Sequence, residues 1–257
     1  MKLGTIQRGF TLIETLTALF VLGVVVALAT QVGATLAKTT RRIDAESRLI
    51  EEVRTAQEVI TSKLLAAWYV YPPGTRLAFN GGATTRNALA GRPDWTVGED
   101  PIVAMVLPPG APGSSCQRGG DTRGCYQLVA YYAFPRGHYQ ASVGPGQRLP
   151  EDPENADTWV LMEFRANLYG YAPAGPCDPV PVPGGNLSRL SGRLLAEYLQ
   201  PEEEDPAYTL FEVGDAGSVT LRLRMARSLH GAKVRVPAAS RPPLALTITP
   251  RNLRACR

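Results

Sequence analysis

The alternation of apolar and polar positions divides the chain into three parts. Residues 10–32 are almost wholly apolar and contain one charged residue, Glu14. At a rise of about 1.5 Å per residue, a helix of this length is able to cross a hydrocarbon core of ~30 Å. We therefore expect a membrane-spanning helix over residues 10–32.

The second part, residues 33–68, contains no proline and many charges, so we expect the helix to continue through it. Its apolar residues recur at steps of three, four and seven, which predicts one apolar stripe that a head domain covers; a free coiled coil is the alternative. Tyr71-Pro72-Pro73-Gly74 then ends the helix. The stripe consists of Ile43, Ile50, Val53, Ala56, Ile60 and Leu64.

In the third part, residues 69–257, short apolar runs with a period of two lie between glycines and prolines, which is typical of strands. The fold class is therefore α+β, with a long N-terminal helix packed on a mainly antiparallel sheet in a single head domain. Two stretches, Pro108–Gly124 and Ala172–Gly185, are interpreted as surface loops, and Ser188–Leu199 is predicted to be a short amphipathic helix. The predicted strands are Ile102–Leu107, Tyr126–Phe134, Trp159–Tyr169, Tyr208–Val213, Val219–Met225, Lys233–Val236 and Leu244–Thr249.

Glu14 is an unusual residue for a membrane-spanning helix. Placing an ionised carboxylate inside a membrane costs roughly 2.5 kcal/mol or more unless the group is neutralised or finds a partner. The chain reads Arg8-Gly9-Phe10 just before it. If the chain were cut after Gly9, the new amino group on Phe10 would lie one helical turn from Glu14 or would face the glutamate of a neighbouring copy. Such a pairing sets an axial register between packed helices.

This glycine, the sequence Phe10-Thr11-Leu12-Ile13-Glu14 and the apolar helix together resemble the processing site of type IV prepilins and type II secretion pseudopilins. The resemblance implies a leader of residues 1–9 that is removed by a membrane peptidase, N-methylation of Phe10, and an assembly role for Glu14. It also implies a pilin-like fold. One departure is Gln31, which stands where major pilins usually have a helix-kinking proline.

The resemblance further implies the partners and the location. The partners are a prepilin peptidase and methylase, other major and minor pilins, an inner-membrane assembly platform, and membrane lipid before assembly. The chain would span the inner membrane once, with a periplasmic or extracytoplasmic head, and would reach the cell surface in a pilus.

The predicted 188–199 helix, the strands Tyr208–Val213 and Val219–Met225 that follow it, and the late sequence Pro250-Arg251-Asn252-Leu253 together loosely resemble the C-terminal half of W-type minor pilins and J-type minor pseudopilins. The favoured interpretation is a minor pilin in the priming or tip complex of a type IV pilus, which is a structural subunit and not an enzyme. A minor pseudopilin of type II secretion is the alternative within the family. A signal-anchored extracytoplasmic enzyme or receptor is the alternative from another class.

An ordinary secretory signal peptide is a rival interpretation of the N-terminus. Lys2 and Arg8 would form its basic region, residues 16–26 its apolar region, and Ala27-Leu28-Ala29 its cleavage site. The early Glu14 and the position of Gly9 before the apolar run argue against it. A plain signal anchor without a filament role is a further possibility.

The four cysteines have no C-x-x-C spacing, and disulfides are expected in a head outside the cytoplasm. Of three possible pairings we favour Cys116–Cys125, which closes a short glycine-rich loop, with Cys177–Cys256, which pins the C-terminus. Free buried thiols are the alternative. A C-terminal disulfide also resembles the disulfide-bounded C-terminal region of many pilins.

The sequence contains none of the common catalytic or nucleotide-binding motifs, and we expect no cofactor and no metal. The acidic segments 151–157 and 202–205 lack the spacing of a calcium loop and are interpreted as solvated loops. The net charge of +4 is low for a dedicated nucleic-acid binder. DNA remains a weaker candidate partner, through a set of basic and aromatic residues comprising Arg118, Arg123, Arg136, Arg148, Tyr131, Tyr132 and Tyr139.

Overall fold

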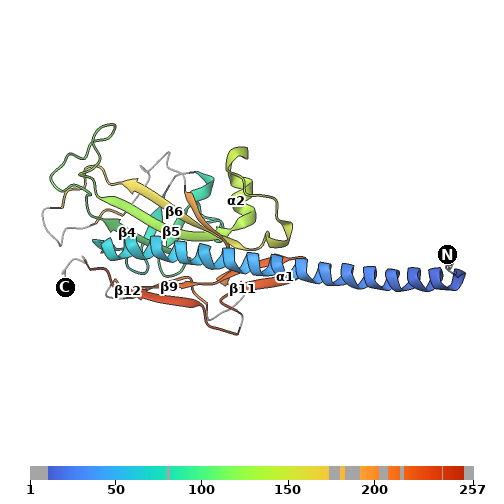
Figure 1. Cartoon of the computed structure of the whole chain (residues 1–257). Coiled ribbons are helices and arrows are strands. Elements are labelled where there is room, and N and C mark those ends of the chain that lie inside the picture. The colour runs from blue at the N-terminus through green and yellow to red at the C-terminus, as the bar shows by residue number, and fades with distance from the viewer. Residues whose placement is uncertain are drawn as a thin grey trace, which may run out of the picture. The chain divides into compact units, whose positions relative to one another are not determined.

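The structure, a computed structural model, describes residues 11–79, 82–173, 180–182, 192–202, 208–214, 217–238 and 240–251. The chain divides into two units, one up to Ala45 and one from Glu46 onward. Figure 1 shows a long helix and a head built mainly of strands. This is the α+β architecture predicted from the sequence.

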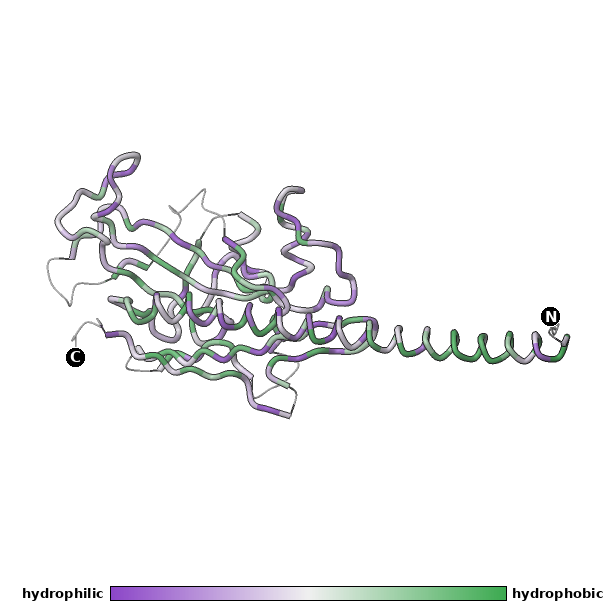
Figure 2. Tube along the Cα trace, viewed as in Figure 1, coloured by the Kyte–Doolittle hydropathy of each residue, from purple (hydrophilic) through white to green (hydrophobic). Residues whose placement is uncertain are grey.

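Helix α1 (Leu12–Ala66) extends through both units without interruption, including the position of Gln31. In the first unit its large apolar side chains are exposed; Leu12 is 80% exposed and Phe20 is 74% exposed. Figure 2 shows the helix nearer its N-terminus as mostly hydrophobic, whereas residues 38–45 at the end of this unit are mainly polar or charged. By length and composition the helix is able to cross a membrane, a test that a signal sequence near an N-terminus also passes.

In the second unit α1 contributes a narrow apolar stripe to the core of the head. The prediction that the head covers a stripe is confirmed, but its members differ in part, because Ile43 is exposed and Ile50 is only partly buried. The helix ends at Ala66, two residues earlier than expected. The buried stripe is Leu49, Val53, Ala56, Ile60 and Leu64, at steps of four, three, four and four residues.

A seven-stranded antiparallel sheet forms the main layer of the head, in the order β1-β4-β5-β6-β7-β10-β11. Nearly all residues of β4, β5 and β6 are buried, which explains why these sequences are almost continuously apolar. The strands are β1 (Tyr69–Val70), β4 (Ile102–Leu107), β5 (Gln127–Pro135), β6 (Trp159–Asn167), β7 (Arg193–Leu199), β10 (Met225–Leu229) and β11 (Ala232–Val236).

Segment 79–97, of which residues 80 and 81 lie outside the described residues, covers aromatic residues of the central strands. It carries η1 (Ala83–Thr85), which lies between the two strands of a small ribbon, β2 (Arg76–Ala78) and β3 (Asp94–Thr96). The ring centroids of Phe79 and Phe164 are 4.6 Å apart, and those of Trp95 and Tyr132 are 4.8 Å apart. The Tyr132 hydroxyl donates to Thr84 O at 2.8 Å, so a buried polar group is satisfied.

A second, three-stranded sheet has the order β12-β9-β8, formed by β8 (Phe211–Val213), β9 (Val219–Leu223) and β12 (Leu244–Ile248). The predicted strand Val219–Met225 is wrong in one respect, because it is broken at Arg224. Beyond that residue Met225 begins β10 and joins the seven-stranded sheet. Arg224 stabilises the place where the chain passes from one sheet to the other. Its backbone O accepts a hydrogen bond from Gln200 N at 2.9 Å, and its guanidinium donates to Arg241 O at 3.1 Å.

The predicted helix at Ser188–Leu199 is contradicted over its described part. Residues 193–199 form β7, which pairs with β6 on one side and with β10 on the other; residues 188–191 lie outside the described residues. The segment Arg193-Leu194-Leu195-Ala196-Glu197 has good helix formers, but a place between two strands overrides that weak propensity.

The remaining differences are local. Pro108–Gly124 has no helix or strand, as expected, and the described part of Ala172–Gly185 has none either. Helix α2 (Arg136–Ser142) and the short helices η2 (Pro145–Gln147) and η3 (Pro153–Asn155) were not predicted.

Candidate functional site

Glu14 lies in the first turn of α1. The carbonyl of Thr11 accepts hydrogen bonds from Glu14 N at 3.0 Å and from Thr15 N at 3.2 Å, so the helix is already formed at this residue. The positive end of the helix dipole favours a carboxylate here. The acidic group is therefore held at the N-terminal end of an apolar helix.

The threonines around Glu14 do not offer it a partner. Thr15 donates its hydroxyl to Leu12 O at 2.8 Å, and Thr17 donates to Ile13 O at 2.9 Å and to Glu14 O at 3.0 Å. Such bonds to the preceding turn satisfy hydroxyls inside an apolar environment. The hydroxyl groups of Thr15 and Thr17 are thus satisfied by backbone carbonyls of their own helix.

The Glu14 carboxylate has no hydrogen bond or ion pair with any residue in the described part of the chain, and it lies among exposed apolar side chains. Leu12, Ile13 and Leu16 are 80%, 72% and 59% exposed. A carboxylate in apolar surroundings is costly unless it is neutralised by protonation or paired with a cation, and the described residues supply no such cation. Gly9 and Phe10 also lie outside them, so cleavage and methylation stay predictions.

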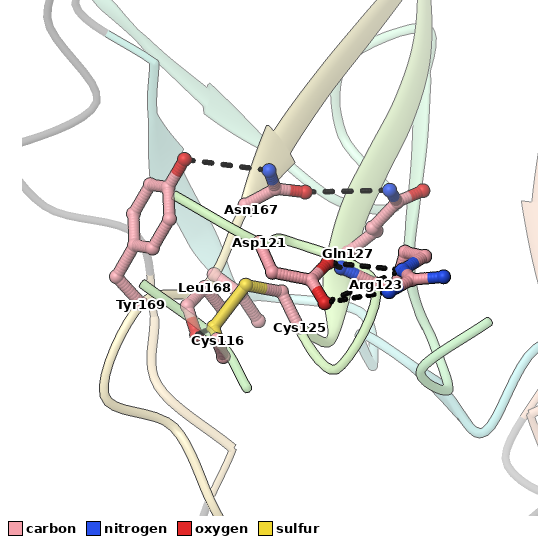
Figure 3. Close-up of a disulfide and its surroundings, with 8 residues drawn as sticks. All are labelled: Cys116, Asp121, Arg123, Cys125, Gln127, Asn167, Leu168 and Tyr169. Carbon is pink, nitrogen blue, oxygen red and sulfur yellow. Dashed lines mark hydrogen bonds and ion pairs between the residues drawn. A yellow bond between two sulfur atoms is a disulfide. The ribbon is translucent and has the colours of Figure 1, made fainter. Parts of the chain in front are cut away.

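The head contains the predicted disulfide between Cys116 and Cys125, whose Cα atoms are 4.7 Å apart. It closes a surface loop in which Arg123 Nη2 pairs with Asp121 Oδ2 at 3.0 Å (Figure 3). Cys177 and Cys256 lie outside the described residues, and their pairing stays a prediction. The structure thus fixes one of the two predicted bridges.

The basic and aromatic residues considered for DNA do not form a common surface. Tyr131 and Tyr132 are fully buried, and Arg136 is 2% exposed. Arg123 is already paired with Asp121. Proximity in the sequence does not place these residues on one surface, because the three tyrosines and Arg136 are buried while the other three arginines are exposed.

The acidic segments are engaged in contacts within the head. Asp152 accepts hydrogen bonds from Asn155 Nδ2 at 2.8 Å and from the Tyr198 hydroxyl at 3.1 Å. Glu202 accepts from Leu210 N at 2.5 Å. In the described ranges no three acidic, histidine or cysteine side chains are grouped as metal ligands, and residues 203–205 lie outside those ranges.

A second carboxylate on α1, Glu52, was missed by the sequence reasoning. Its Oε1 accepts a hydrogen bond from the backbone N of Glu197 on β7, so it joins the helix to the sheet. Burial raises the pKa of Glu52 from 4.5 to about 7, although the hydrogen bond from Glu197 N lowers it. Glu52 is therefore able to exchange its proton near neutral pH.

The groups around Glu52 form a cluster of mixed charge. Arg136 Nε lies 3.5 Å from Glu197 Oε2, and Arg227 Nη2 lies 3.7 Å from Asp152 Oδ2. The Arg227 guanidinium also lies 4.8 Å from the centroid of the Tyr198 ring. Burial raises the pKa of Glu197, while Arg136 lowers it. The cluster connects α1, α2, β7, β10 and the start of η3, and these contacts hold the elements together.

Comparison with protein families matches residues 5–30 to the prokaryotic N-terminal methylation motif. The matched segment includes Gly9, Phe10 and Glu14, and it is consistent with the type IV prepilin and pseudopilin families. The motif supports a type IV pilin-like or pseudopilin protein, and it implies processing by a prepilin peptidase and assembly with other pilins. No curated protein and no solved structure matches the chain.

Proposed function

We propose that the protein is a minor pilin, a non-enzymatic subunit of the priming or tip complex of a type IV pilus. The observation that carries this proposal is the isolated Glu14 carboxylate on an exposed apolar helix. In a bundle of such helices, the methylated amine of Phe10 on a neighbouring subunit supplies the missing positive charge. Pairing then fixes the axial register of the incoming subunit.

Before assembly the apolar half of α1 anchors the subunit in the inner membrane, with the head on the extracytoplasmic side. An inner-membrane platform and other pilins then draw the subunit into the filament. The Cys116–Cys125 disulfide supports this location of the head, because disulfides persist in oxidising compartments.

A minor pseudopilin of type II secretion is the second candidate. It shares the methylation motif and the same assembly chemistry, but its filament does not extend from the cell surface. A signal-anchored enzyme or receptor is the candidate of another class. A role in natural transformation through DNA binding would require a basic surface other than the arginine and tyrosine residues considered above for DNA.

Mass spectrometry of the N-terminal peptide tests the proposal, on whole membranes and on sheared surface filaments. A methylated Phe10 terminus in both samples is the expected result. The same terminus in membranes alone favours a pseudopilin. A terminus at Thr30 indicates a secreted protein and an intact Met1 indicates a plain anchor, and either result rejects the filament role.

A further inference from the structure

Within the described ranges strand β12 pairs with β9 alone, so its other side is an open edge of the three-stranded sheet there. Leu244 and Leu246 are 40% and 39% exposed, although they share a face with the buried Ile248. An open edge presents backbone N–H and C=O groups that another strand is able to pair with.

The other edge strands of three or more described residues are protected by charge. β11 carries Lys233 and Arg235, β8 carries Glu212, and the ribbon strands β2 and β3 carry Arg76 and Asp94. Charged side chains on an edge discourage the addition of a further strand. β12 reads Leu-Ala-Leu-Thr-Ile and has none, which distinguishes it from the others.

A groove of about 420 Å³ lies between Leu246 and the face of α1 that does not enter the core. Arg54 and Glu58 line it, and their side chains form no ion pair or hydrogen bond with any described residue. Side chains directly opposite on paired strands lie about 5 Å apart. A residue added beside Leu246 would therefore reach this groove and its two free charges.

We propose that β12 accepts an extended segment of a partner protein, which adds as a fourth strand and places side chains in the groove between Leu246 and α1. The complementary segment alternates apolar and polar residues and carries one acidic side chain for Arg54 and one basic side chain for Glu58. This recognition is carried by the head alone and is independent of the proposed pairing of Glu14.

The test uses the full chain in detergent micelles and a labelled synthetic nonapeptide of alternating valine and threonine with one glutamate and one lysine. We expect saturable binding by fluorescence anisotropy and at least tenfold slower deuterium exchange of amides in β12. Leu246→Lys and, separately, Leu244→Lys should weaken binding at least tenfold. Ala232→Lys is the matched control, because it adds a charge to the exposed edge strand β11, and it should change binding less than twofold.

Unchanged exchange in β12 on adding the peptide would overturn the proposal, as would equal weakening by Ala232→Lys. Self-association in sedimentation that Leu246→Lys abolishes, without peptide binding, would identify a second copy as the occupant instead. Peptide binding that requires removal of residues 252–257 would assign the groove to the chain's own C-terminal segment. Each variant is compared by its unfolding transition, so that loss of folding is recognised separately.

Discussion

Two glutamates on the same helix have opposite surroundings. Glu14 is exposed among apolar side chains and has no partner in the described residues, whereas Glu52 is partly buried and accepts a backbone hydrogen bond from Glu197. An unpartnered carboxylate favours association with another molecule, while a bonded one stabilises the fold of its own chain. The two residues therefore call for different experiments.

Glu14→Ala should leave processing at Gly9 intact and reduce incorporation into filaments by at least tenfold, because the variant offers no charge to the neighbouring amine. Immunoblots of sheared filaments and of membranes measure both effects. Thr17→Ala is the matched control, since the Thr17 hydroxyl bonds only to its own helix. Wild-type incorporation of Glu14→Ala would contradict the pairing.

Glu52→Gln should remove part of the pH dependence of stability. The folded-state pKa of Glu52 is about 7, above its usual 4.5, so the unfolded chain loses this proton first as the pH rises. Wild-type stability should therefore decrease between about pH 4.5 and pH 7 and then level off. Above pH 7 the variant should be more stable than the wild type by roughly 1–3 kcal/mol, because glutamine keeps the hydrogen-bond acceptor without the buried charge.

Urea unfolding of the full chain in detergent at pH 5 and pH 8, followed by tryptophan fluorescence, measures this difference. Glu51→Gln is the control, because Glu51 is the exposed neighbour on the same helix and should retain the wild-type dependence on pH. Parallel pH profiles for wild type and Glu52→Gln would show that the carboxyl is not buried as described.

At the scale of elements, the start of β7 depends on a glycine. A Cβ on Gly192 would lie 2.2 Å from the Tyr132 hydroxyl oxygen and 3.2 Å from Thr84 O. The Tyr132 side chain is fully buried and bonded to Thr84 O, so it has no space to move. The approach of β7 to segment 79–97 therefore requires the absence of a side chain.

Gly192→Ala should destabilise the head by roughly 1–3 kcal/mol, the usual effect of an overpacked interior. Thermal unfolding by circular dichroism measures it. Gly144→Ala is the control, because nothing lies within 4 Å of a Cβ there and the residue has an ordinary φ of −68°. Equal melting temperatures for the two variants would mean that β7 does not approach Tyr132 this closely.

Elements whose pattern reflects burial were predictable from the sequence. β4 was predicted with its observed bounds, and the bounds of β5 and β6 differed by at most two residues, because these strands are apolar over most of their length. β7 was mistaken for a helix because its pairing with β6 and β10 is not encoded in local propensity.

For the candidate site, Glu14 was evident because one charge interrupts an apolar run. Glu52 was not, because it stands in the charged sequence Glu51-Glu52 and looks like part of a solvated face. Its burial follows from its position beside Val53 in the stripe that the head covers. Contacts between distant segments, such as that of Glu52 with Glu197, leave no local signal in the sequence.

At the scale of the whole molecule, the boundary between the two units lies within α1. Residues from Glu46 onward include the helical stripe, and Leu49, Val53, Ala56, Ile60 and Leu64 are at most 2% exposed within the core of the head. The helix is therefore one continuous element that serves two environments. The sequence pattern placed the first covered residue of the stripe at Ile43, whereas the core of the head includes the helix only from Leu49 onward.

A chain that starts at Glu46 should be soluble and should unfold cooperatively, because it keeps the complete core. A chain that starts at Trp68 should aggregate, because it lacks the five stripe residues and exposes the surface that they cover. Size-exclusion chromatography and urea unfolding distinguish the two. A soluble, cooperative chain from Trp68 would show that the helix is not part of the head's core.

The open edge of β12 also bears on how the protein avoids forming fibres. Arg241-Pro242-Pro243 precede the strand and Pro250-Arg251 follow it closely. Proline cannot donate a ladder hydrogen bond, and arginine repels like copies, so both act as gatekeepers of an aggregation-prone segment. Pairing at this edge is thereby confined to residues 244–249, between the flanking prolines and arginines. These flanks leave room for one added strand and disfavour the stacking of many copies into a fibre.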